Sequence, residues 1–197
     1  ASVSGGHVGR ARRLATDEQA RQRRQRALGL ARDAATPTRA YAAAEELVAT
    51  AEAEARALTE DRDEAESDEL RTALGAGGTG KGTAGTMRGA TGAIKDLERR
   101  QKSRHTRASR DALDRALIDL ATYFRDALLV ASGAGEVALN HPDMREKVAA
   151  LAAHAPPDKL LRCIEAVLTC REALAGNVKP KFAVDAMVGT VGQALRS

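Results

Sequence analysis

The stretch DALDRALIDLATYFRDALLVAS, residues 111–132, carries the clearest structural pattern in the chain. Its large apolar residues recur three or four positions apart, at Leu113, Leu117, Leu120, Phe124 and Leu128. Because an α-helix turns once in 3.6 residues, this spacing places all five side chains along one side of a helix. The pattern predicts a helix over residues 92–132 with one buried face.

Three further helices are predicted downstream of this stretch. One opens at Pro142, with His141 before it as a candidate cap, and runs to about His154; a second covers residues 158–175, and a third starts at Pro180. Proline suits the first turn of a helix, where its missing N–H needs no partner, and glycine favours helix ends. The expected breaks are Gly133 and Gly135, Pro156-Pro157, and Gly176-Asn177. Short connections between the last four helices favour an antiparallel bundle.

Upstream, the sequence predicts one very basic helix from His7 to Leu28, after a short turn that contains glycine. A break over residues 29–38 leads into a long helix over residues 38–73, which is rich in Ala and Glu. Residues 75–91 are rich in glycine. Because fixing glycine costs conformational entropy, they are predicted to form a flexible surface loop.

Composition supports the same fold class. Ala, Leu, Arg and Glu dominate the 197 residues, Trp is absent, and there are only two Phe and two Tyr. Strands favour β-branched and aromatic side chains, whereas the dominant residues here are strong helix formers. We therefore expect an all-α helical bundle.

The net charge of +4 hides a strong segregation of charge along the chain. Residues 10–26 hold seven Arg against two acids, residues 45–69 hold eleven acids against two Arg, and residues 95–115 hold eight basic residues against four acids. Such blocks suggest charged partners, nucleic acid among them, although solvated helix faces explain the acidic block more simply.

The residues that carry chemistry form no recognisable catalytic or metal-binding pattern. Gly75, Gly80 and Lys81 have the spacing of a phosphate-binding P-loop, but Gly82 stands where Ser or Thr should bind Mg²⁺, and an acidic helix precedes the motif in place of a strand. None of the four histidines has a partner at a metal-ligand spacing. The chain is therefore not expected to be an enzyme, and no cofactor or metal is expected.

Cys163 and Cys170 are expected to be free thiols that pack as small apolar residues. Seven residues separate them, which puts their Cα atoms about 10 Å apart on a helix, too far for a disulfide. Free thiols, the lack of an apolar run long enough for a membrane span and the lack of a signal peptide indicate a cytoplasmic location.

The C-terminal half resembles a known family. The segment LLRCIEAVLTCREALAGNVKPKFAVDAMV, residues 160–188, resembles the end of the bacterial DNA polymerase III clamp-loader delta-prime subunit, an AAA+ family member, in its high-GC, actinobacterial type. The matching positions are Arg171, Glu172, Ala173, Leu174, Asn177, Val178, Pro180 and Lys181. Residues 97–128 also resemble the collar domain of these proteins.

The N-terminal segment SGGHVGRARRLATD, residues 4–17, resembles the end of the AAA+ lid. ATPase relatives carry a sensor Arg in this motif; here Gly9 aligns with that position and Arg10 follows one residue late. The resemblance thus implies a family member that does not sense ATP. It also implies two regions: residues 1–34 as the end of the lid, and residues 35–197 as the collar, an oligomerisation domain of packed helices.

The resemblance further implies what the chain does and with what it assembles. Collar domains of delta, delta-prime and three gamma/tau ATPase subunits close a pentameric ring, which positions the AAA+ modules to load a sliding clamp on primed DNA during replication. On this reading the chain supplies assembly contacts with these subunits, and meets the clamp and DNA only indirectly. From amphipathicity and the resemblance, we expect the last two helices to form the subunit interface, with Leu174, Val178, Phe182 and Met187 near or under it.

Two other functions stay open on the sequence alone. One is a helical nucleic-acid-binding module that uses residues 10–26 and 95–115; its DNA-proximal residues would be Arg99, Arg100, Lys102, Arg104 and Arg107. The lack of interleaved aromatic residues argues against sequence-specific readout. The other is a nucleotide-binding enzyme built on the glycine-rich segment, which would depend on Lys81.

Overall fold

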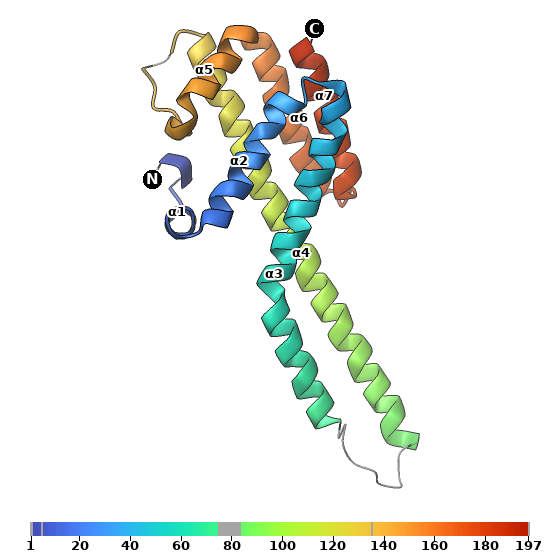
Figure 1. The fold of residues 1–197 in the computed structure, drawn as a ribbon. Coiled ribbons are helices and arrows are strands. Elements are labelled where there is room, and N and C mark those ends of the chain that lie inside the picture. The colour runs from blue at the N-terminus through green and yellow to red at the C-terminus, as the bar shows by residue number, and fades with distance from the viewer. Residues whose placement is uncertain (1, 5, 75–83, 135, 197) are drawn as a thin grey trace. The chain divides into compact units, whose positions relative to one another are not determined.

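The computed structural model describes residues 2–4, 6–74, 84–134 and 136–196, and in these ranges it contains helices and no strand (Figure 1). In chain order the elements are η1 (Ser2–Ser4), α1 (Val8–Thr16), α2 (Glu18–Asp33), α3 (Pro37–Ala73), α4 (Ala84–Ala131), η2 (Pro142–Met144), α5 (Arg145–His154), α6 (Pro157–Ala175) and α7 (Pro180–Arg196). The predicted all-α class is confirmed. None of the described helices combines the length and the apolar character needed to cross a lipid bilayer.

The chain divides into two compact units. The first, which we call the bundle, comprises Ala1–Thr50 and Leu113–Ser197; the second, which we call the hairpin, comprises Ala51–Ala112. The long helices α3 and α4 contribute residues to each unit. The division falls inside these two helices, and the assignment of residues 1–34 to an AAA+ lid stays a prediction.

The core of the bundle is built around the apolar stripe that the sequence predicts on α4. Leu113, Leu117, Leu120 and Phe124 are each no more than 1% exposed, while Leu128 is half-buried. Completely buried partners come from the later helices: Val148 on α5, Leu160 and Val167 on α6, and Val184, Val188 and Val191 on α7. Burying one such side chain contributes about 1.5–3 kcal/mol, so the stripe is a main source of stability.

The ends of α4 and α6 explain why the later helices separate where the sequence predicts. After α4, Gly133 takes the left-handed conformation at φ 76°, and the Ala134 N–H bonds to the Leu129 carbonyl at 2.8 Å. After α6, Asn177 takes φ 65°, and the Val178 N–H bonds to the Ala173 carbonyl at 3.0 Å. Both arrangements are Schellman caps, which satisfy the last carbonyls of a helix and turn the chain.

The prediction of one basic helix from His7 to Leu28 is wrong. The chain forms two helices, α1 and α2, because Asp17 leaves the helical conformation and its side chain accepts a hydrogen bond from the Ala20 N–H at 3.0 Å. This N-cap starts a new helix. The helix then continues through Gly29 to Asp33, so the break before α3 is shorter than the expected 29–38.

The glycine-rich segment also differs from its prediction. Residues 84–91, expected to belong to a loop, form the start of α4. Residues 75–83, which include the P-loop-like spacing and Lys81, lie outside the described residues.

Candidate subunit-interaction surface

The pairing of α6 with α7 provides the best-formed candidate surface. The two helices lie side by side (Figure 1). Cys163 and Val167 on α6 and Val184 and Val188 on α7 are completely buried. An ion pair from Arg171 to Asp114, with Nε and Oδ1 2.7 Å apart, also ties α6 to α4. These contacts hold the two helices in place, so the side chains on their outer face have fixed positions.

Four large apolar side chains stay exposed on this helix pair, and we call them the α6–α7 surface: Leu161, Leu168, Val178 and Phe182. Phe182 is 61% exposed and is the only aromatic residue of the two helices. Leu161 and Leu168 are seven residues apart, which places them on one face of α6. An exposed aromatic side chain such as Phe182 is typical of protein–protein contacts.

A groove of about 580 Å³ runs between the two helices beside this surface. Val178 lines it from the connection before α7, Phe182 from the first turn of α7, and Glu165 from α6. Cys170 and Ala183 contribute small side chains to its floor. An exposed aromatic residue next to a groove gives a surface that is able both to insert a side chain into a partner and to receive one.

The four predicted interface residues separate into two kinds. Val178 and Phe182 are 41% and 61% exposed, so they are available to a partner. Leu174 and Met187 are only 6% and 2% exposed. Their side chains belong mainly to the core beneath the surface, so they support it and offer a partner little contact area. The interface itself stays a prediction.

The predicted DNA-proximal residues lie on the hairpin, and two of them, Arg99 and Arg104, form ion pairs within it. Arg104 Nη2 lies 2.6 Å from Asp63 Oδ1 and 2.6 Å from Glu66 Oε2, so it joins α4 to α3. Its hydrogen bonds lower the pKa of Glu66 to about 2, and those from Arg62 add to the effect. Arg99 pairs with Asp96 on its own helix. Thus Arg104 of α4 neutralises two carboxylates of the acidic block on α3.

The other predicted DNA-proximal residues, Arg100, Lys102 and Arg107, are exposed. Lys95, one turn or more before them, is exposed as well. None of the four has an ion-pair partner among the described residues. Because residues seven positions apart share a side of a helix, Lys95 and Lys102 form one row on α4 and Arg100 and Arg107 form another; we call the four the hairpin cations.

The basic residues of α1 and α2 are largely engaged within the chain. Arg10 forms an ion pair with Asp119 on α4. Burial raises the pKa of Asp119, although the positive charge of Arg10 acts in the opposite direction. Arg21 pairs with Glu18 at 2.5 Å. Arg24, discussed next, is buried. The basic segment 10–26 therefore offers fewer free cations than its sequence suggests.

Sequence reasoning does not reveal a polar cluster that consists of buried Arg24, Asp126 and His141, half-buried Thr122 and exposed Asp143. Arg24 donates to Asp143 Oδ2 at 2.7 Å and to His141 Nδ1 at 2.5 Å. His141 Nε2 lies 2.9 Å from Thr122 Oγ1. Completely buried Asp126 accepts the His141 backbone N–H at 2.8 Å. The cluster joins α2, α4 and the start of η2.

The cluster keeps the imidazole of His141 neutral. Because a guanidinium has no acceptor, His141 Nδ1 accepts from Arg24, and the ring proton resides on Nε2, toward Thr122. Burial, and then the charge of Arg24, lower the pKa of His141 to about 4. The expectation that His141 caps a helix is wrong in this respect: its side chain makes no capping hydrogen bond to η2.

Stability should therefore fall as pH decreases from about 6.5 to about 4. In this window His141 binds a proton in the unfolded chain but not in the folded one, so acid favours unfolding. The pKa difference corresponds to a loss on the order of 3 kcal/mol. Urea unfolding at several pH values measures it. Carboxylates titrate in the same window, so His141→Gln is the control: its stability should depend less on pH, and equal slopes for the two proteins would contradict the assignment.

The two cysteines are buried free thiols, as predicted. Burial raises the pKa of Cys163 to about 12 and that of Cys170 to about 11, so both stay protonated at neutral pH. A thiol in this state is a poor nucleophile and a poor metal ligand. Within the described part of the chain, His, Cys, Asp and Glu form no group suited to a metal ion.

Comparison with known families gives one match. Residues 108–181 match the family model described as DNA polymerase III, delta subunit, C terminal. The matched segment begins in α4, includes α5 and α6, and ends at the start of α7, so it contains Val178 and ends one residue before Phe182. Although it covers less than half of the chain, the match supports membership of the clamp-loader family. No curated protein and no solved structure matches the chain.

Proposed function

We propose that this chain is the C-terminal, non-catalytic assembly part of a clamp-loader delta-prime subunit of the high-GC type. In this role it joins the collar ring with delta and the gamma/tau ATPase subunits in the cytoplasm, and the assembled loader places the sliding clamp on primed DNA. The family match supports a role in clamp-loader assembly in general. The delta-prime identity rests on the resemblance of residues 4–17 and 160–188.

The observation that carries the proposal is the exposure of Val178 and Phe182 beside the groove between α6 and α7. Permanent subunit interfaces are larger and more apolar than transient ones. A few buried residues, often aromatic, contribute most of their binding energy. Phe182 at the start of α7 is such an aromatic residue, and the core holds its helix in place. The α6–α7 surface thus provides the contact that ring assembly requires.

Replacing Val178 and Phe182 together with Asp should reduce binding to the matching gamma/tau subunit at least 100-fold. Each Asp would be a charge forced into an apolar contact, whereas in the free chain both positions face water, so the helix content and the melting temperature should stay nearly unchanged. Isothermal titration calorimetry measures the affinity, and circular dichroism measures the fold.

The matched control is the double replacement Leu58→Asp and Ile94→Asp. These apolar residues are 59% and 44% exposed but lie on the hairpin. This control should bind like the unmodified chain. If the α7 variant still binds with full affinity, or if both variants lose affinity equally, then the α6–α7 surface is not the interface. Met187 is unsuitable for this test because it is buried.

A second candidate function, nucleic-acid binding, is favoured by the hairpin cations. Lys95, Arg100, Lys102 and Arg107 are exposed and have no ion-pair partner among the described residues. Evenly spread helix cations of this kind suit phosphate contacts without sequence readout.

If these cations bind DNA, the affinity for a primed template should fall steeply with salt. Replacing Lys102 and Arg107 with Ala should weaken binding and reduce the slope of log K against log salt by about 1 for each phosphate that the variant no longer neutralises. Fluorescence anisotropy with labelled primed DNA measures both. Lys179→Ala, on the bundle, is the control. Binding that does not depend on salt, or that survives the double replacement, would exclude this function.

A further inference from the structure

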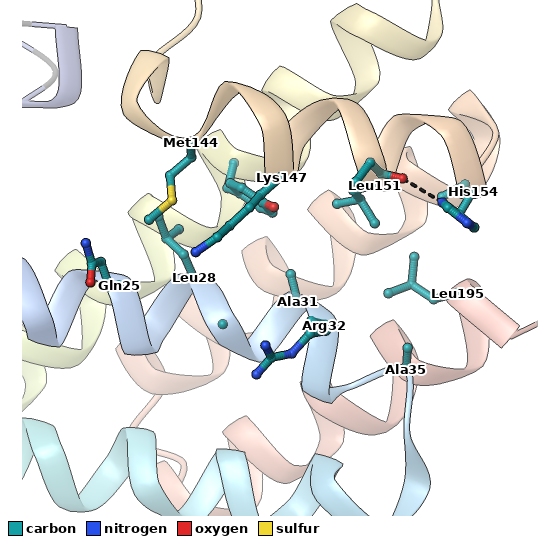
Figure 2. Close-up of a pocket in the computed structure, with 14 residues that line it drawn as sticks. Gln25, Leu28, Ala31, Arg32, Ala35, Met144, Lys147, Leu151, His154 and Leu195 are labelled. Carbon is teal, nitrogen blue, oxygen red and sulfur yellow. Dashed lines mark hydrogen bonds between the residues drawn. The ribbon is translucent and has the colours of Figure 1, made fainter.

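A second cavity of the bundle lies between α2 and α5, and the surface proposed for subunit contacts contributes nothing to it. Its volume is about 440 Å³, within the range of ligand-binding pockets (Figure 2). Leu28 and Ala31 from α2, Met144 at the end of η2, Leu151 from α5 and Leu195 from α7 give it apolar walls. Figure 2 shows the α5 side chains facing α2 across this space.

The charged groups around this cavity are all basic. Arg32 and Lys147 line it, together with the imidazole of His154, and no Asp or Glu does. Figure 2 shows Lys147 reaching from α5 toward the part of α2 between Gln25 and Ala31, while His154 turns to the Ala150 carbonyl, with its Nδ1 2.7 Å away. Lys147 is exposed and has no ion-pair partner among the described residues. An apolar cavity with a cationic rim suits an amphipathic anion.

A neighbouring cavity of about 430 Å³ lies on the other side of α2 and shares part of its lining with the first. Gln25, Gly29, Arg32 and Lys147 line both. The second cavity adds Arg23 and Arg26, against the two carboxylates Asp33 and Glu46. Arg32 pairs with Asp33 at 3.0 Å and Arg23 pairs with Asp17 at 3.4 Å, which leaves Arg26 and Lys147 against Glu46. The α2 residues that line both cavities, Gln25, Gly29 and Arg32, lie over about two turns of the helix.

Gly29 is the residue at which they meet, and no contact within the chain accounts for it. A glycine in a helix interior weakens the helix, and it is usually explained by a close neighbour or a strained backbone. At Gly29 neither applies, because a Cβ atom would have nothing within 4 Å and the residue lies within regular α2. The missing side chain leaves a gap in the ridge of α2 between the two cavities.

We propose that the two cavities form one binding site for an acidic peptide segment of a partner protein, which crosses α2 at Gly29. An apolar side chain of the peptide enters the cavity between α2 and α5, and its carboxylates face Lys147 and Arg26. The glycine allows the peptide backbone to approach the helix closely. Cations spread over both sides of α2 suit an extended ligand with several charges better than a small molecule with one.

The apolar cavity also argues against a nucleic-acid ligand. A phosphate backbone would use the cations but would leave the walls formed by Leu28, Met144 and Leu151 uncovered. Tyr123 from α4 lines the cavity but is only 6% exposed, so it offers a base little area for stacking. Complementary charge in combination with an apolar pocket is the usual basis for recognition of acidic, amphipathic peptides.

The test uses the full chain and three fluorescein-labelled hexapeptides in anisotropy titrations. The first combines four Asp with two central Leu, the second replaces both Leu with Ser, and the third replaces the four Asp with Lys. The first peptide should bind at least tenfold more tightly than the other two. Equal binding of the first two peptides would show that the apolar cavity is not used, and would overturn the proposal.

Two variants locate the binding. Lys147→Glu should weaken the first peptide at least tenfold, whereas Lys179→Glu, which removes an exposed cation outside both cavities, should change it less than twofold. Gly29→Leu should also weaken it at least tenfold while it raises the melting temperature, because Leu is a good helix former and closes the gap. Peptide binding that survives both pocket variants, or a dT12 oligonucleotide that binds more tightly than the peptide and depends on Lys147, would overturn the proposal.

Discussion

The free energy of unfolding should decrease by about 3 kcal/mol when Asp126 is replaced by Ala. This carboxylate is completely buried and accepts two backbone N–H groups, from Asn140 at 3.1 Å and from His141 at 2.8 Å, at the turn that leads into η2. Each buried donor left without an acceptor costs about 1–3 kcal/mol. Without these bonds the turn that carries His141 should move away from Arg24, and the whole polar cluster should become weaker. Urea unfolding, followed by circular dichroism, measures the change.

The control for this prediction is Arg125→Ala. Arg125 also bonds to Asp126, with Nη1 and Oδ1 2.9 Å apart, but its side chain is 38% exposed. Removing it leaves Asp126 with its two backbone donors and should cost less than about 1 kcal/mol. If Asp126→Ala is no more destabilising than this control, the carboxylate does not hold the turn.

Two glycines of the same helix should respond in opposite ways to replacement by Ala. A Cβ atom at Gly192 would lie 2.4 Å from the carbonyl oxygen of Ala34, so α7 would have to move away from the end of α2. That carbonyl also accepts a hydrogen bond from Arg196 at 3.2 Å, which the movement would disturb. Forcing a methyl group against backbone costs more than the gain in helix propensity, so Gly192→Ala should lose roughly 2 kcal/mol.

Gly189 lies on the same helix, one turn earlier, and is the matched control. A Cβ atom there would lie 3.6 Å from the hydroxyl oxygen of Tyr41, an ordinary contact. Gly189→Ala should therefore stabilise the protein by up to about 1 kcal/mol, through helix propensity alone. Thermal unfolding of the two variants measures both effects. A stabilised Gly192→Ala variant would show that α7 is not packed against Ala34 in this way.

The fold follows from local signals to a large extent. The stripe on α4 is regular over four turns, and Gly133, Asn177 and Pro180 mark boundaries by their own backbone preferences, which need no distant partner. The break at Asp17 is hard to predict because basic helix formers surround it on both sides. Only the capping bond to the Ala20 N–H distinguishes an N-cap from an acid inside a helix.

The candidate sites are less predictable, because they depend on contacts between distant residues. Arg24 and His141 are 117 positions apart, and neither stands out from the other basic residues of the chain. On α7 the apolar residues cover so wide an arc that sequence does not tell which of them face the core. Met187 packs inward and Phe182 outward because α6 occupies one side of the helix.

The central claim, that this chain is a clamp-loader assembly part, is tested most directly by size-exclusion chromatography with light scattering. The chain would be mixed with the collar-containing C-terminal half of the matching gamma/tau subunit, at low and at high salt. The account predicts a complex of defined mass that persists at high salt, because apolar contacts are not screened by ions. Failure to form a complex at either salt concentration, with salt-sensitive binding to primed DNA in its place, would contradict it.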